Sequence, residues 1–194
     1  YMDEKDANDN LTGKRVTTSD YASASYYYVN KSSLPKVYGG FNTSLSWKGF
    51  DLSAIFAYSI GGYIYNRDIT MILHNGSLEG RDWSTEILKR WTPENRYTDV
   101  PALSTTSNNW NSASTRFLQN NSYMRLKNLT LSYDLPKQWI SKLALSSVQV
   151  FVQGDNLFTI HRNQGLDPEQ GITGITYYRY PAMRTISGGI NLSF

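Results

Sequence analysis

Apolar and polar residues alternate with a period of two in two neighbouring stretches of the chain. Between Phe41 and Trp47 the odd positions carry the larger and more apolar side chains, whereas Asn and Ser fill the even positions. The alternation resumes directly after the two-residue stretch Lys48-Gly49, with an apolar face formed by Phe50, Leu52, Ala54, Phe56 and Tyr58. Successive side chains of a strand point to opposite faces, so this pattern predicts an antiparallel hairpin over residues 36–60.

The length of the two runs and their aromatic residues suit a membrane-crossing hairpin. Each run has about ten residues, which a tilted strand needs to cross the hydrocarbon core of a bilayer. Transmembrane barrels carry girdles of aromatic residues at both membrane interfaces. Trp47 and Phe50 flank the turn and are expected at one interface, Tyr58 is expected at the other, and Tyr133 is a further interface candidate.

Three more alternating runs follow in residues 122–194, of which the last, Thr185 to Phe194, is the most regular. The first of them, Ser122 to Tyr133, changes phase: Met124 and Leu126 are apolar at even positions, but later apolar residues fall at odd positions. A β-bulge near Lys127 and Asn128 would restore one continuous apolar face. A shift of exposure near the rim of the sheet is the alternative.

Polar, irregular segments separate the runs and divide the chain into four parts. Residues 1–35 are expected to form an extracellular loop region, and residues 36–60 the transmembrane hairpin. Residues 61–121 are expected to form a long extracellular loop with one short helix, Ser84 to Trp91, capped by Ser84 with Ile87, Leu88 and Trp91 on one stripe. Residues 122–194 are expected to hold three transmembrane strands, a periplasmic turn and an extracellular loop from about Leu157 to Ala182.

The strands predict an all-β fold that cannot be a complete barrel by itself. Transmembrane barrels have at least about eight strands, and an open sheet edge in lipid leaves backbone groups without partners. Five strands facing lipid therefore need further strands, from chain that precedes Tyr1 or from another polypeptide. The inner face, mostly Ser, Asn, Gln and Thr, suits a wet or plugged lumen better than a packed core.

Composition removes several classes of function. The 194 residues include no cysteine, which excludes disulfides and Cys-ligated metals, and the two histidines argue against a metal centre. The net charge of +3, without a stripe of basic and aromatic residues, does not favour nucleic acid. The polar start at Tyr1 is no signal peptide, so an export signal is expected elsewhere and the chain is interpreted as a piece of a longer protein.

Several phrases of the sequence resemble the SusC/RagA type of TonB-dependent outer-membrane transporter. They occur in the order found in that family and span nearly the whole chain from about residue 34. The phrases are Leu34 to Phe41 with Trp47 to Ser53, Gly61 to Asn66, Arg90 to Asn95 with Asp99 to Pro101, Tyr123 to Pro136, Asp155 to Thr159, Gly165 to Glu169, and Tyr180-Pro181 with Arg184 to Ile186.

The resemblance implies the C-terminal part of a barrel of about 22 strands with a plugged lumen, of which this chain would supply the last five strands and their loops. It also implies partners: the N-terminal remainder with the plug and other barrel strands, the TonB complex reached through that remainder, and a SusD-type surface lipoprotein. The implied function is import of oligosaccharides or peptides across the outer membrane of a Gram-negative bacterium, without a cofactor. Ile190, Leu192 and Phe194 resemble the C-terminal signal read by the outer-membrane assembly machinery.

Aromatic residues of the expected extracellular loops are the candidates for substrate contact. Trp110, Tyr177, Tyr178 and Tyr180 could stack on sugar rings at the outer mouth. Anchoring of the loops, or contact with the lipoprotein, is the alternative.

Other polar motifs are interpreted as structural. Asp167 and Glu169 flank Pro168 and are expected to form a turn rather than the carboxylate pair of a glycosidase. His74 and His161 are expected on the surface. Asp6, Asn8 and Asn10 imitate the start of a calcium loop, but Leu11 and Thr17 stand where glycine and glutamate are needed, so no metal site is expected.

Two other classes of function remain beside the importer. Alternation alone also suits a soluble β-sandwich that binds carbohydrate, although aromatic rims and a polar second face argue against it. An outer-membrane hydrolase is the other class, but no nucleophile, base and orienting residue occur together, so no enzyme is expected.

Overall fold

The computed structural model describes residues 1–76, 78–104, 106, 109–141, 145–169, 171–176 and 178–194. The chain forms two compact units. Unit 1 contains residues 1–31, 65–118 and 175–177, and unit 2 contains residues 32–64, 119–174 and 178–194.

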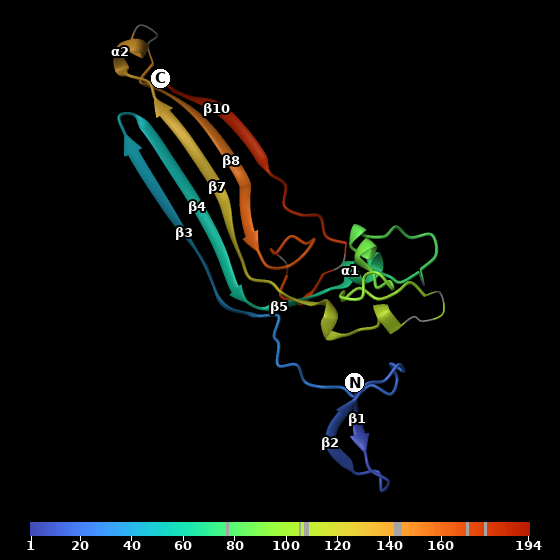
Figure 1. The fold of residues 1–194 in the computed structure, drawn as a ribbon. Helices are drawn as coiled ribbons and strands as arrows, with labels where there is room; N and C mark the ends of the chain where they lie inside the picture. Colours follow the sequence, from blue (N-terminus) through green and yellow to red (C-terminus); the bar gives the residue numbers. More distant parts are fainter. Residues whose placement is uncertain (77, 105, 107–108, 142–144, 170, 177) are drawn as a thin grey trace. The chain divides into compact units, whose positions relative to one another are not determined.

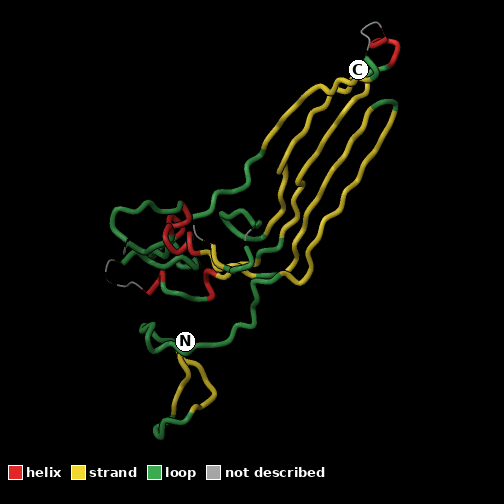
Figure 2. The backbone as a smooth tube through the Cα atoms, turned by 180° about the vertical axis from the view of Figure 1, so that it is seen from behind, coloured by secondary structure: helices red, strands yellow, loops and turns green. Residues whose placement is uncertain are grey.

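Unit 2 is built on one antiparallel sheet of five long strands (Figures 1 and 2). The strand order is β10-β8-β7-β4-β3. The strands are β3 (Pro35–Trp47), β4 (Phe50–Gly61), β7 (Tyr123–Asp134), β8 (Ser147–His161) and β10 (Thr185–Ser193). The prediction of an all-β chain with five long antiparallel strands is confirmed.

The predicted hairpin is formed by β3 and β4. Lys48 and Gly49 both have positive φ, 49° and 87°, as a two-residue hairpin turn of the primed type requires. This turn sets a register in which Trp47 pairs with Phe50 and Phe41 with Phe56. The rings of Phe41 and Phe56 stack with centroids 4.7 Å apart, so the apolar residues of both strands lie on the same face.

The bulge predicted near Lys127 and Asn128 is present. Between β4 and β7 the pairing passes from Ile55↔Asn128 directly to Phe56↔Leu126, so Lys127 has no partner on β4. The register between β7 and β8 also shifts at this point. The extra residue brings the even and odd apolar positions of β7 onto one face.

The register therefore gives the sheet one apolar and one polar face. The apolar face includes Phe41, Leu45, Trp47, Phe50, Leu52, Phe56, Tyr58, Met124, Leu126, Leu129, Leu131, Tyr133, Val150, Val152, Phe158, Ile160, Ile186, Ile190 and Leu192. The polar face includes Asn42, Ser44, Ser53, Arg125, Asn128, Thr130, Ser132, Gln149, Gln153, Asp155, Thr159, Ser187 and Asn191. Phe151 is an apolar residue on the polar face, where its ring lies over the paired Gly189: a Cβ there would come within 2.9 Å of it.

Unit 2 does not bury its apolar face. Leu45, Val152 and Ile186 are 67%, 48% and 76% exposed, respectively. A sandwich would cover such a face with a second sheet, but no second long sheet exists among the described residues. Among them there is also no helix long and apolar enough to cross a membrane.

A glycine in β3 sets the distance between β3 and β4. A Cβ at Gly40 would lie 2.8 Å from the backbone oxygen of Phe56, which cannot move without distorting the strand. We expect Gly40→Ala to destabilise the sheet by about 1–3 kcal/mol through overpacking. Urea unfolding of the protein measures this, with Ser44→Ala on the same face as control; equal midpoints for the two variants would refute it.

Residues 1–35 contain more regular structure than the predicted loop. Strands β1 (Met2–Lys5) and β2 (Leu11–Val16) form a small hairpin in unit 1. Asp6 holds its turn by accepting hydrogen bonds from the amides of Asn8 and Asn10, at 2.8 and 2.9 Å. Such short side-chain turns create hairpins without a long alternating pattern. The interpretation of this segment as loop was incomplete.

Between β5 (Tyr63–Asn66) and β6 (Leu118–Asn120) the chain forms short helices. They are α1 (Arg67–Ile72) and the 3₁₀ helices η1 (Thr85–Lys89), η2 (Asn109–Asn111) and η3 (Thr115–Phe117). Helix α1 was not predicted: it has only six residues, too few for a period, but Asn66 caps it by accepting from the amide of Ile69.

The predicted helix from Ser84 to Trp91 is present only in part. Ser84 is the N-cap, as expected, but the helix is the 3₁₀ helix η1 and ends at Lys89. Ile87 is 5% exposed, whereas Leu88 is 73% exposed, so the expected apolar stripe was wrong. A 3₁₀ helix repeats every three residues, so residues four apart no longer share a side as they would in an α-helix.

The remaining connections differ from prediction in length. Strand β8 continues to His161, so the loop expected from about Leu157 starts at Arg162. Helix α2 (Lys137–Ile140) follows β7, and residues 142–144 lie outside the described part. Strand β9 (Ile175–Thr176) pairs in parallel with β5 through Tyr65 and Asn66.

Candidate functional site

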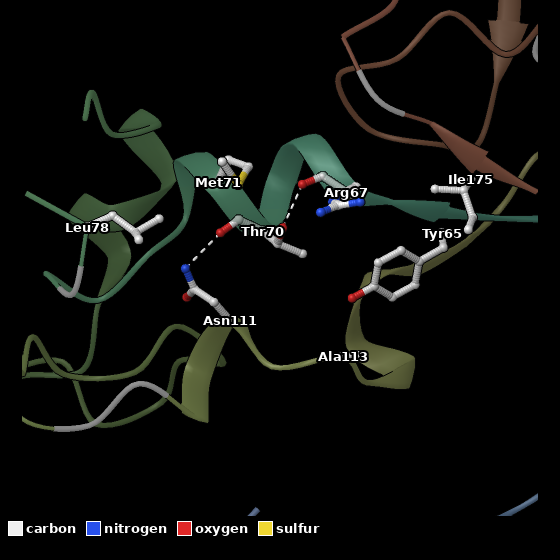
Figure 3. A pocket seen from close by; sticks show the side chains of 8 residues that line it. All are labelled: Tyr65, Arg67, Thr70, Met71, Leu78, Asn111, Ala113 and Ile175. Atoms are coloured by element: carbon white, nitrogen blue, oxygen red, sulfur yellow. Dashed lines mark hydrogen bonds between the residues drawn. The ribbon is translucent and has the colours of Figure 1, made fainter. Parts of the chain in front are cut away.

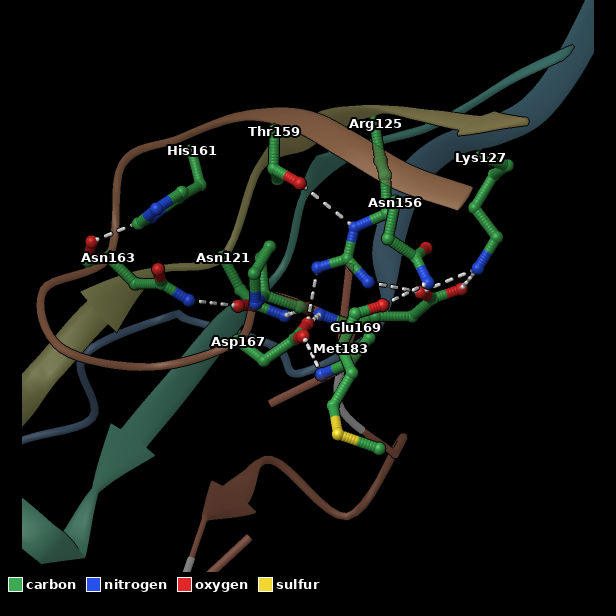
Figure 4. A network of polar contacts seen from close by, with 12 residues as sticks. Asn121, Arg125, Lys127, Asn156, Thr159, His161, Asn163, Asp167, Glu169 and Met183 are labelled. Atoms are coloured by element: carbon green, nitrogen blue, oxygen red, sulfur yellow. Dashed lines mark hydrogen bonds and ion pairs between the residues drawn. The ribbon is translucent and has the colours of Figure 1, made fainter. Parts of the chain in front are cut away.

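Arg125 is the central residue of a polar network on the polar face of the sheet (Figure 4). It lies in β7 opposite Ala57 on one side and Thr159 on the other. Its guanidinium donates from Nε to Thr159 Oγ1 at 3.0 Å, from Nη2 to Asp167 Oδ1 at 2.6 Å, and from Nη1 to Glu169 Oε2 at 2.8 Å. The side chains of Arg125 and Asp167 are only 4% and 7% exposed. This is a buried, hydrogen-bonded ion pair.

The bulge residue Lys127 extends this network. Its Nζ lies 3.0 and 2.9 Å from the two carboxylate oxygens of Glu169. This pair is more exposed, with side-chain fractions of 35% and 39%. A bulge re-aims a side chain next to a strand, and here Lys127 meets the same loop as Arg125.

The loop that follows β8, residues 162–184, is called the anchored loop because these contacts fasten it to the polar face. Asp167 accepts hydrogen bonds from the amides of Glu169 and Ala182, at 2.9 and 2.7 Å, which joins the two limbs of the loop. Asn121 donates from Nδ2 to the carbonyl of Pro168 at 2.9 Å. The loop therefore folds over the polar face of its own sheet.

Asp167 and Glu169 are structural, which agrees with the turn predicted for them. Each carboxylate forms an ion pair with a basic side chain on β7. Burial raises the pKa of Asp167, but the amides of Ala182 and Glu169 and the Arg125 guanidinium lower it by more, so the pKa lies below 3.8.

The depressed pKa of Asp167 predicts how the anchored loop responds to acid. A carboxylate whose pKa is lowered on folding stabilises the fold above its unfolded pKa, and this contribution disappears as the pH falls through the folded pKa. We expect the amides of Glu169 and Ala182, which donate to Asp167, to stay protected from hydrogen exchange down to the ordinary value of 3.8 and to lose protection only below it. Exchange corrected for intrinsic rates measures this, with Asp167→Asn as an unprotected reference. Release of the wild-type loop between neutral pH and about pH 5 would contradict the assignment.

The aromatic residues predicted to contact substrate have different surroundings. Trp110 donates from its indole nitrogen to the carbonyl of Leu73, and the Arg116 guanidinium lies 3.5 Å above its ring. One face of Trp110 is thus occupied within unit 1. Tyr178 and Tyr180, in unit 2, are 64% and 97% exposed. Tyr177 lies outside the described residues.

The predicted interface aromatics lie at the ends of strands. Phe50 and Tyr133 form a cross-strand pair with ring centroids 4.4 Å apart, and Trp47 is paired with Phe50 beside the turn. Tyr58 lies toward the opposite end of β4, opposite Gly39. Ile190 and Leu192 lie on β10, and Phe194, the residue after it, is 90% exposed.

One of the two histidines is not where it was expected. His161 is exposed, but His74 is only 1% exposed, so its prediction as a surface residue was wrong. Its Nδ1 accepts hydrogen bonds from the indole of Trp83, at 3.0 Å, and from the amide of Gly76, at 3.3 Å. His74 therefore orders its loop in unit 1, a role set by residues that no local pattern identifies.

Unit 1 also contains a cavity of about 560 Å³ beside helix α1 (Figure 3). Its polar lining includes Tyr65, Arg67 and Asn111, and its apolar lining includes Met71, Leu78 and Ile175. Asn111 donates from Nδ2 to the carbonyl of Thr70 at 2.8 Å, which fixes η2 to α1. Within the described residues no cluster of three or more His, Cys, Asp or Glu side chains could hold a metal ion.

The sequence alone did not identify Arg125 as a key residue. The available signal was one long basic side chain among the small polar residues of an alternating strand. Its partners lie 42 and 44 positions away, so only the folded chain brings them together.

Comparison with known proteins gives a consistent result. The chain is 33% identical over 166 residues to TonB-dependent receptor P3 of Formosa agariphila, covering 80% of the chain and 16% of that protein. It is 27% identical over 168 residues to TonB-dependent receptor SusC of Bacteroides thetaiotaomicron, covering 86% of the chain and 16% of SusC. No protein-family model matches the chain.

Solved structures give the same result for the fold. The RagAB peptide importer in its closed-closed state matches with a TM-score of 0.80 at 35% identity, covering 98% of this chain and 20% of the other. Its open-open state matches with the same TM-score and covers 92% of this chain. The chain spans about a sixth (16%) of the length of the curated relatives. The chain therefore belongs to the TonB-dependent receptors of the SusC and RagA type and is a segment of an outer-membrane β-barrel.

Proposed function

We propose that this chain forms part of the wall and loops of a TonB-dependent importer that takes up oligosaccharides or peptides across the outer membrane of a Gram-negative bacterium. The observation that carries the proposal is the unbroken apolar face of the five-stranded sheet, maintained through the bulge at Lys127. An exposed apolar band opposite a polar face is the pattern of a barrel wall between lipid and a lumen. The names of the relatives, a SusC receptor and a peptide importer, support the transport class over an enzyme.

The partners follow from the open sheet and from the relatives. Strands β3 and β10 each have an edge that pairs with no other strand in this sheet, and lipid does not satisfy such edges. We propose that further strands and a plug from the rest of the receptor complete the barrel. TonB would act through that rest, and a SusD-type lipoprotein would cover the mouth, as the likeness to RagAB and SusC suggests.

We propose that the segments have the roles expected from the sequence. In the proposed arrangement the Lys48–Gly49 turn and the α2 connection face the periplasm, and residues 1–35, 61–121 and 162–184 lie on the extracellular side. Trp47, Phe50 and Tyr133 would then lie at the periplasmic interface of the outer membrane, and Tyr58 at its extracellular interface. Tyr178 and Tyr180 remain candidates for stacking on substrate, whereas the contacts of Trp110 favour loop anchoring.

Uptake measurements with the full-length receptor test this function. A strain that lacks the receptor gene is complemented with the wild-type gene, and uptake of fluorescent maltooligosaccharides and of mixed short peptides is measured with and without a functional TonB. We expect at least one substrate class to enter only when both receptor and TonB are present. Uptake that persists without TonB, or no uptake of either class by a correctly inserted receptor, would refute the proposal.

A further inference from the structure

A cavity of about 340 Å³ lies in unit 2 between the anchored loop and the polar face of β7 and β8. Its walls include polar and charged side chains from both sides: Arg125, Asn156, Thr159, His161, Arg179 and Arg184. Figure 4 shows four of them, Arg125, Asn156, Thr159 and His161, close to the anchoring carboxylates. Asp167 also lines the cavity, where its carboxylate accepts hydrogen bonds from Arg125 and from the amides of Glu169 and Ala182.

The cavity has an excess of positive charge. Arg125 and Lys127 are balanced by Asp167 and Glu169, with which they form ion pairs. Arg179 and Arg184 add two further guanidinium groups, and in the described part of the chain neither lies within ion-pair distance of a carboxylate. The excess suits an oxyanion, since guanidinium groups bind carboxylates through paired hydrogen bonds.

The carboxylate of the sheet that lies nearest to Arg184 in the strand register is Asp155, which pairs with Thr185 and already has other hydrogen-bond partners. Asp155 lies on the polar face and accepts hydrogen bonds from Asn128 Nδ2, at 2.8 Å, and from Gln153 Nε2, at 3.4 Å. It does not line the cavity. The two arginines are therefore not held by a carboxylate of this sheet.

Asn156 adds a second, independent feature. Its Nδ2 donates to the carbonyl of Met183 at 3.1 Å, and its Oδ1 is buried without a hydrogen-bond partner in the described residues. A buried acceptor without a donor is unfavourable and calls for one. A ligand that carries an N–H or O–H next to its carboxylate would supply that donor while its oxyanion meets the arginines. The remaining polar wall includes Thr159 and His161.

We propose that this cavity is a carboxylate pocket that binds an acidic group of the imported substrate. Arg179 and Arg184 are the charged donors, and Asn156 Oδ1 accepts from the adjacent N–H or O–H. Peptide carboxylates have a neighbouring N–H, and sugar acids have neighbouring hydroxyl groups, so both substrate classes offer this chemistry. The inference rests on the proposed function, because the cavity faces a substrate only if the polar face borders the lumen.

Saturation-transfer NMR on the full-length receptor in detergent tests the pocket directly. The probes are N-acetylglutamate and galacturonate, each compared with its uncharged counterpart, N-acetylglutamine or galactose. The receptor is studied as wild type, as the double variant Arg179→Gln/Arg184→Gln, and as Arg162→Gln. Arg162 lies in the same loop and is exposed, but it does not line the cavity, so it controls for the loss of a positive charge.

We expect at least one acidic probe to bind the wild type and the Arg162→Gln variant more strongly than its uncharged counterpart does. In the double variant this probe should bind at least about tenfold more weakly, because two charge-assisted contacts are removed. Binding of N-acetylglutamate alone identifies peptide acids as the ligand, and binding of galacturonate alone identifies sugar acids. Equal binding of acidic and neutral probes, or acid binding that survives in the double variant, overturns the pocket. Uptake in the TonB experiment is measured separately, so a receptor that still imports but does not prefer acids disproves the pocket without disproving the importer.

Discussion

Replacing Arg125 by glutamine is expected to release the anchored loop from the polar face of the sheet. The substitution removes the guanidinium that bonds Asp167, Glu169 and Thr159 together. It leaves Asp167, whose side chain is 7% exposed, as a buried carboxylate without its cation. Removing one partner of a buried ion pair costs about 3–5 kcal/mol.

Limited trypsin digestion of the full-length receptor measures the release. Cleavage after Arg162, Arg179 and Arg184 should be much faster in Arg125→Gln than in the wild type, while the strands remain resistant. Lys127→Gln is the matched control: its more exposed ion pair should contribute at most about 1 kcal/mol, so cleavage should change little. Equal cleavage of the Arg125→Gln receptor and the wild type would show that the network does not hold the loop.

A second large effect is expected where a charge is placed on the apolar face. Phe41→Arg puts a guanidinium on the face that we assign to lipid, near the middle of β3, and removes the stack with Phe56. An arginine facing lipid costs about 2–4 kcal/mol at the bilayer midplane, and loss of the aromatic pair adds about 0.5–1.5 kcal/mol.

The neighbouring residue provides the control. Asn42→Arg places the same side chain on the polar face of the same strand, where a wet lumen accepts it. We expect the Phe41→Arg receptor to fold poorly or unfold at lower denaturant concentration, and the Asn42→Arg receptor to behave like the wild type. If the Asn42 variant were the one impaired, the two faces would be assigned the wrong way round.

The sheet could be predicted from the sequence because its pattern is local. Side chains alternate strictly along a strand, so the apolar period, the Lys48-Gly49 turn and the phase change near Lys127 each had only a few structural explanations. The bulge was predictable because the sheet has one apolar face, which a phase change would otherwise interrupt. Phe151 was an exception to the alternation. It is an apolar residue on the polar face, and only the cross-strand register shows that its ring lies over the paired Gly189 of β10.

The loops were less predictable because their order comes from contacts that are distant in the sequence. Helix α1 and the β1–β2 hairpin are too short for a period and depend on caps by Asn66 and Asp6. The burial of His74 depends on the indole of Trp83. The network of Arg125 with Asp167 and Glu169 joins a strand to a loop that follows the next strand. Neither hydropathy nor spacing indicates which charged loop residue meets which strand.

The most direct test of the membrane assignment is a nitroxide scan along β7 of the full-length receptor in a lipid bilayer. This chain has no cysteine, so single cysteines can be introduced at each position from Tyr123 to Asp134 and labelled once any cysteines in the rest of the receptor are replaced. Collision rates with oxygen, which concentrates in lipid, and with a water-soluble nickel chelate are then measured by EPR. We predict high oxygen accessibility at Met124, Leu126, Leu129 and Leu131, low oxygen accessibility at the intervening polar positions, and a change of phase at Lys127. An unbroken period of two through Lys127, or apolar positions that neither oxygen nor the chelate reaches, would contradict a lipid-facing barrel wall.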